Sequence, residues 1–130
     1  IIETLKYFLA GKGVWGWVYM PLWKCQVCGF VFEGPEAPAK CPKCGAPKEQ
    51  FKQLSDQEAQ LVLRSRKTNY LHQKALTLLR ELLAVAEEII QDNLDPACVK
   101  IGQEEKEFAL TAIQKIMAEL ETHMKKGKWG

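Results

Sequence analysis

The sequence predicts a small metal-bound module of short strands and cysteine knuckles, followed by an α-helical hairpin. Two Cys-x-x-Cys-Gly motifs, at Cys25–Gly29 and Cys41–Gly45, predict the first part. Over most of residues 55–130, apolar residues recur at every third or fourth position, as in an amphipathic helix. Two helices alone bury both apolar stripes poorly, so we expect the hairpin to complete a bundle by dimerisation or by docking on a partner.

The composition limits the function. The 130 residues leave room for one ordinary domain or for a small module with a helical piece. A net charge of only +2 argues against a nucleic-acid partner. The sequence shows no apolar run near the roughly 20 residues that a membrane span needs. Paired cysteine motifs without a secretory signal favour a metal site over disulfides, and with it a cytoplasmic location.

Residues 1–20 form an N-terminal extension of unknown role. The spacing of Ile1, Leu5, Phe8 and Leu9 predicts a short helix that ends at the following glycines. Residues 14–19 are aromatic and β-branched and predict a strand. Met20 precedes the cysteine module directly and is a plausible natural start of translation, so the extension need not belong to the native protein.

Residues 21–54 form the metal-binding domain, with Cys25, Cys28, Cys41 and Cys44 as the ligands. Four thiolates at this spacing close a tetrahedral shell and leave no position for substrate or water. The metal therefore either holds the fold together or passes single electrons. Phe30–Phe32 predicts a short strand, and 34–38 a rigid loop. The small apolar core comprises Trp23, Phe30, Phe32 and Phe51.

Within residues 22–54 three stretches carry a family resemblance: Trp23-Lys-Cys-Gln-Val-Cys-Gly-Phe30, the loop Glu33–Pro38, and Cys41-Pro-Lys-Cys-Gly-Ala-Pro47 through Phe51. They resemble the rubredoxin-like domain of rubrerythrins. The resemblance implies one iron ion per chain, held by the four cysteines, that exchanges single electrons with a redox partner protein. A zinc ribbon with the same ligands is the alternative, because cysteine spacing does not separate zinc from iron. The chain would then be a structural interaction or adaptor protein.

The di-iron chemistry of rubrerythrins is not expected here. That family binds its di-iron site with glutamates and two Glu-x-x-His motifs on a four-helix bundle. This chain has two histidines, His72 and His123, and neither follows such a glutamate. We therefore expect no enzyme, but an electron carrier or accessory subunit.

Residues 55–130 form the helical hairpin. Ser55 and Glu58 fit a capping box at its start, and the polar run 64–69 suggests an interruption of the first helix. The run 92–96 should end that helix, with Asp95 and Pro96 opening the second. Gly102 suggests a division near the start of the second helix. The stripes comprise Ala75, Leu79, Leu82, Ala86 and Ile89, widened by Leu71, Leu78, Leu83 and Ile90, and then Ala109, Ile113, Ile116, Leu120 and His123.

Three further residues outside the cysteine motifs need an interpretation. An antiparallel hairpin brings His72 near His123, with Glu119 beside them, but we interpret the histidines as polar residues at the bundle end rather than metal ligands. Cys98 lies beyond a filled metal shell and is expected to be a buried small apolar residue. No cationic cluster or histidine adjoins it to activate its thiol.

Overall fold

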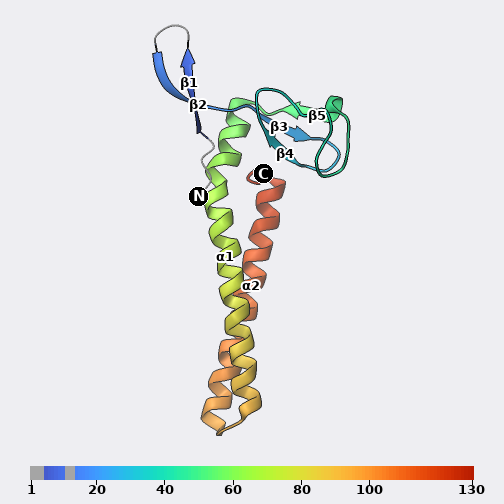
Figure 1. The fold of residues 1–130 in the computed structure, drawn as a ribbon. Helices are drawn as coiled ribbons and strands as arrows, with labels where there is room; N and C mark the ends of the chain where they lie inside the picture. Colours follow the sequence, from blue (N-terminus) through green and yellow to red (C-terminus); the bar gives the residue numbers. More distant parts are fainter. Residues whose placement is uncertain (1–4, 11–13) are drawn as a thin grey trace. The chain divides into compact units, whose positions relative to one another are not determined.

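The structure, a computed structural model, describes residues 5–10 and 14–130 (Figure 1). They form two compact units. One contains the chain up to Arg66 together with Gly130, and the other contains Lys67–Trp129. The long first helix begins in the first unit and continues in the second.

The N-terminal extension contains a β-hairpin. Strands β1 (Leu5–Ala10) and β2 (Val14–Tyr19) pair antiparallel, with Leu5 opposite Tyr19 and Ala10 opposite Val14. The strand predicted at 14–19 is confirmed, whereas the helix predicted over the preceding residues is wrong for 5–10. A helix of about two turns is marginal in water, and pairing with β2 satisfies the backbone of the same segment. The beginning of that predicted helix, 1–4, and its expected end, 11–13, lie outside the described residues.

A three-stranded antiparallel sheet supports the cysteine motifs. Its order is β4-β3-β5, with β3 at Leu22–Cys25, β4 at Val31–Glu33 and β5 at Phe51–Gln53. A short 3-10 helix, Lys48–Gln50, precedes β5. The strand predicted at Phe30–Phe32 is confirmed with its start one residue later. The small sheet and knuckle module followed by helices is thus the predicted architecture.

The sheet packs against the first turns of the following helix. Leu22, Ala59 and Val62 are buried together, and Val31, Leu54 and Leu63 pack on them. Arg66 adds polar contacts: its Nη1 lies 3.8 Å from Glu33 Oε2, and its Nε donates to the Gly130 carbonyl at 2.9 Å. The sheet and the start of the helix therefore share a core, which is separate from the buried cluster around the cysteines.

Helix α1 runs from Asp56 to Asp92. The capping box is confirmed, since the Glu58 amide donates to Ser55 Oγ at 3.1 Å and the Ser55 amide to Glu58 Oε1 at 2.9 Å. The expected interruption at 64–69 is wrong. Ser65 and Asn69, from that polar run, are buried with their side chains hydrogen-bonded, so the helix continues through them.

Helix α2 runs from Pro96 to Lys125. Asp95 caps it, accepting a hydrogen bond from the Cys98 amide at 2.7 Å, and Pro96 follows as predicted. Gly102 does not divide the helix. It is buried, and a Cβ at that position would lie 3.0 Å from Ile90 and 3.2 Å from the Ala86 carbonyl oxygen. Glycine stands there because the two helices approach closely.

Within the second unit α1 and α2 lie side by side as an antiparallel hairpin (Figure 1). Two contacts establish the antiparallel direction. Near the turn, Lys106 forms an ion pair with Glu87 at 3.5 Å, and at the other end His123 contacts Asn69. The buried seam comprises Asn69, Leu76, Ala86, Gly102, Ala109, Leu120 and His123. Across the described residues, none of the helices is both long and apolar enough to cross a bilayer.

Candidate metal centre

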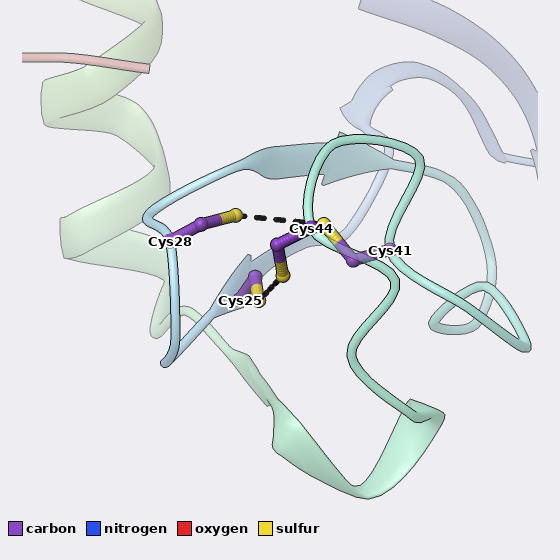
Figure 2. A group of neighbouring side chains, drawn as sticks. All are labelled: Cys25, Cys28, Cys41 and Cys44. Carbon is purple, nitrogen blue, oxygen red and sulfur yellow. Dashed lines mark hydrogen bonds between the residues drawn. The ribbon is translucent and has the colours of Figure 1, made fainter.

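The four predicted cysteines converge on one point (Figure 2). Their Sγ atoms all lie within 4.8 Å of one another, with 3.7 Å between Cys25 and Cys44 and 3.5 Å between Cys28 and Cys41. A tetrahedral ion with metal–sulfur bonds near 2.3 Å requires sulfur–sulfur distances of about 3.8 Å. Two of the sulfur–sulfur distances are therefore close to those of a tetrahedral shell, and all four thiols are near enough for one ion to bind them.

Two equivalent knuckles hold these thiols. In the first, the Gly29 amide donates to the Cys25 carbonyl at 2.9 Å and the Cys25 amide to the Phe30 carbonyl at 2.8 Å. The second repeats both bonds at the same distances, from Gly45 to Cys41 and from Cys41 to Ala46. Each turn ends on a glycine with positive φ, 82° at Gly29 and 77° at Gly45. An L-residue with a side chain adopts this conformation only at a cost, so the glycines have a conformational role.

The knuckle amides favour negative charge on sulfur. Burial opposes ionisation of Cys41, but hydrogen bonds from the Cys44 and Lys43 amides, together with the neighbouring thiols, lower its pKa to about 6. Burial likewise opposes ionisation of Cys25, and the Cys28 and Val27 amides lower its pKa. The Ala46 amide favours the Cys44 thiolate, but burial and the three other thiols raise its pKa to about 12. This pattern is expected when four thiols compete without a cation, because charge on some sulfurs disfavours charge on the rest.

The centre is shielded on one side and open on the other. Cys25 and Cys41 are buried with Ala37, Ala46 and Phe51, and the predicted aromatic residues Trp23, Phe30 and Phe32 pack against this cluster. Cys28 is half-buried and Cys44 is exposed. Val27, in the turn of the first knuckle, is 63% exposed. Two sulfurs thus lie in an apolar environment, while one reaches the protein surface.

The donor set fits two metals. Four thiolates in a tetrahedral arrangement suit iron or zinc, and they fill every coordination position of such an ion. Among the residues that the structure describes, these cysteines are the one group that brings three or more candidate ligand atoms together.

The histidines form a polar contact near the end of the hairpin. The rings of His72 and His123 are 6.4 Å apart, as the antiparallel hairpin predicts. His123 Nδ1 lies 2.6 Å from Asn69 Oδ1, and its Nε2 lies 3.4 Å from Glu119 Oε2. Asn69 Nδ2 donates to the Lys128 carbonyl at 2.7 Å. The amide of Asn69 is therefore oriented, and His123 must donate its Nδ1 proton to it. No local sequence pattern predicts this pairing, since Asn69 and His123 lie 54 residues apart in the chain.

Cys98 is half-buried rather than buried as predicted. Hydrogen bonding to Asp95 and the charge of that carboxylate raise the pKa of the Cys98 thiol. The neighbouring acidic residue therefore makes the thiol less reactive, in agreement with the expectation that it is not activated.

Comparison with known proteins agrees with the site. Residues 23–52 match the family model described as "Rubrerythrin, rubredoxin-like domain". A protein named reverse rubrerythrin-1 from Clostridium acetobutylicum is 47% identical over 38 residues, which are 29% of this chain and 21% of that protein. A rubrerythrin from Clostridium perfringens is 60% identical over 30 residues, 23% of this chain and 15% of that protein.

A further rubrerythrin, from Nitratidesulfovibrio vulgaris, is 50% identical over 32 residues, 25% of this chain and 17% of that protein. The chain thus spans about a fifth or less of the length of these relatives. The family match and the geometry of the four thiols together identify residues 23–52 as a rubredoxin-like domain of the rubrerythrin type.

Proposed function

We propose that this chain is a non-enzymatic electron carrier that passes single electrons to a partner oxidoreductase. The observation that carries the proposal is the convergence of the Cys25, Cys28, Cys41 and Cys44 thiols within a rubredoxin-like domain. One iron ion held by these thiolates would exchange one electron between its ferrous and ferric states.

The environment of the sulfurs suits this role. Amides from both knuckles point at Cys25 and Cys41, and such donors spread the negative charge of a thiolate and set the redox potential of the site. The buried aromatic side limits access of water to these two sulfurs. On the open side, exposed Cys44 and Val27 offer a partner protein a short approach to the ligands.

The closed shell also argues against catalysis at the metal. Four protein ligands leave no coordination position for a substrate. Neither histidine follows a glutamate at the spacing of a Glu-x-x-His motif, and His123 is engaged by Asn69. An electron at the four-cysteine site would therefore leave to another protein.

The test is the metal and its redox behaviour in the full chain isolated anaerobically from its native host. We expect one iron per chain, a red ferric form, and reversible bleaching by dithionite. Cys41→Ser should lose the colour and most of the metal. The matched control is Cys98→Ser, which removes a thiol outside the tetrahedron and should keep both.

One zinc per chain in a colourless native protein would overturn the electron-carrier proposal and would favour a structural zinc ribbon, since zinc has no redox chemistry. Material overexpressed in a foreign host does not decide the question, because zinc readily occupies four-thiolate sites.

A further inference from the structure

The hairpin carries a second apolar face besides its buried seam. Large apolar side chains recur at intervals of seven residues along it, and all are between 49% and 75% exposed. We call this the outer face, and it comprises Leu71, Leu78 and Val85 on α1, Leu94 in the turn, and Ile101 and Phe108 on α2.

The outer face follows a complete helical pattern on α1. Ala75, Leu82 and Ile89 lie between its exposed members and are half-buried, so that apolar residues alternate in steps of four and three. This is the repeat of a helix that packs against a neighbour on that side. The seam with α2 runs beside this stripe and includes Leu76 and Ala86. Ile89 borders both, since its Cγ2 lies 3.1 Å from the position of a Cβ on Gly102. Helix α1 is therefore patterned for two neighbours, and α2 provides one.

The two helices contribute to the same face. A surface hollow near the turn is lined by apolar or sulfur-containing side chains of both helices and the turn, and by two acidic side chains of α1. They are Val85, Ile89, Leu94, Cys98 and Ile101, with Glu88 and Asp92. Phe108 lies two helical turns beyond Ile101, in the same direction around α2. The apolar surface therefore crosses from one helix to the other instead of forming a single ridge.

The opposite side of the hairpin is different. Helix α2 also exposes Leu110, Met117 and Met124 at intervals of seven residues. The corresponding flank of α1, marked by the ion pair of Glu87 with Lys106, carries polar or charged residues: Gln73, Thr77, Arg80 and Glu87. That stripe is therefore confined to one helix, whereas the outer face is continuous over two.

We propose that the outer face binds the same face of a second copy of this chain, completing a four-helix bundle between two hairpins. A twofold axis allows one self-complementary patch to serve both subunits. A large apolar surface left open would favour aggregation. A second copy is present whenever the chain is made, so it can cover this surface permanently.

The size of the face supports a stable dimer. From Leu71 to Ile89 helix α1 rises about 27 Å, and two helices are about 20 Å wide, which gives roughly 500 Å² in projection. The accessible surface of ridged side chains exceeds their projection, and stable interfaces bury about 800 Å² per partner. The available surface is thus of the same order as the surface that self-association requires.

The test is the mass of the metal-loaded full chain, measured by sedimentation equilibrium at micromolar concentration. We expect twice the chain mass of 14.8 kDa. Leu78→Glu and Ile101→Glu place a charge in the proposed interface and should each weaken the dimer at least tenfold. Both positions are half-exposed in the single chain, so far-UV circular dichroism should still show folded helices. If either glutamate variant unfolds, the glutamine variant at the same position, Leu78→Gln or Ile101→Gln, replaces it. Each should also weaken the dimer, and each disturbs the fold of the single chain less because glutamine is uncharged.

Met117→Glu is the matched control, because Met117 is similarly exposed on α2 but lies outside the outer face. It should leave the dimer intact. A monomeric wild-type chain would overturn the proposal, whether it stays alone or binds a different protein through this face. A dimer that Met117→Glu dissociates and the two outer-face variants leave unchanged would also overturn it. The metal content of the variants is independent of this result, so failure of the dimer and failure of the electron-carrier proposal are distinguishable.

Discussion

Replacing Asn69 by alanine should destabilise the hairpin by several times the effect of an ordinary surface substitution. Asn69 is only 3% exposed, and its amide links both helices: it accepts from His123 and donates to the Lys128 carbonyl. Alanine at position 69 removes both hydrogen bonds at once. In the variant, the Nδ1 proton of His123 would have lost its acceptor, the Asn69 side chain. Because His123 is buried, water could hardly replace that acceptor.

The magnitude follows from those two groups. A buried polar group that loses its partner costs about 1–3 kcal/mol. That range applies to His123, whereas Lys128 is half-buried and its carbonyl can regain part of its hydrogen bonding from water. The total for Asn69→Ala is therefore about 2–4 kcal/mol. Asn69→Asp keeps an acceptor for His123, but it buries a charge and turns a carboxylate oxygen toward the Lys128 carbonyl oxygen, so it is not a milder variant.

The assay is urea unfolding followed by circular dichroism at one fixed protein concentration, so that any self-association affects all variants alike. Thr77→Ala is the control on the same helix, since its exposed hydroxyl contacts the Gln73 carbonyl at a long 3.4 Å. It should change the free energy of unfolding by less than about 0.5 kcal/mol. Combining Asn69→Ala with His123→Ala should give a coupling energy above about 1 kcal/mol. An Asn69→Ala variant as stable as Thr77→Ala would refute the reasoning.

Two further predictions concern the second knuckle and the start of α2. Gly45→Ala should destabilise the metal-loaded protein by about 1–2 kcal/mol through backbone strain alone, because φ is 77° and no atom lies within 4 Å of the added Cβ. Gly45→Asn should cost less in the same denaturation assay, since asparagine tolerates this conformation. Hydrogen bonds from the Cys98 amide lower the pKa of Asp95, so its stabilisation of α2 is present at neutral pH and is lost as the pH falls below about 4. Asp95→Asn should retain the cap and reduce the loss of thermal stability between pH 7 and pH 3. If the variant shows the same pH dependence as the wild type, the Asp95 carboxylate is not the source of that loss.

The sequence was most informative where the determining contacts are local. Each knuckle turn is closed by two hydrogen bonds among residues at most five positions apart, so Cys-x-x-Cys-Gly predicts its turn and its glycine. The first knuckle has in addition a distant bond, from the Gln26 amide to the Gln50 carbonyl at 2.8 Å. The Ser55–Glu58 capping box and the Asp95 cap are local in the same sense. The prediction of four ligands follows from repeating one local motif.

The errors arose where a distant segment decides the structure. The apolar spacing in residues 5–10 suits a helix, but pairing with 14–19 makes the segment a strand. Gly102 suggested a break in α2, whereas the glycine permits close approach of the Ala86 carbonyl from α1. Asn69 lay in a polar run and suggested an interruption, but its partners, His123 and Lys128, come from a segment more than 50 residues later in the chain. None of these outcomes is visible in the local pattern.

The buried polar contact also accounts for how the hairpin selects one alignment. A heptad seam of apolar residues allows two helices to slip by seven residues and still bury similar side chains. Such a slip would place Asn69 opposite Ile116 instead of His123. The Asn69 amide oxygen would then lose the hydrogen bond that it accepts from the His123 imidazole. The penalty for an unpaired buried amide then acts against the shifted alignment and not against the native one. Asn69 and His123 therefore restrict the register of the hairpin, and that register determines which residues of α1 and α2 lie level on the outer face.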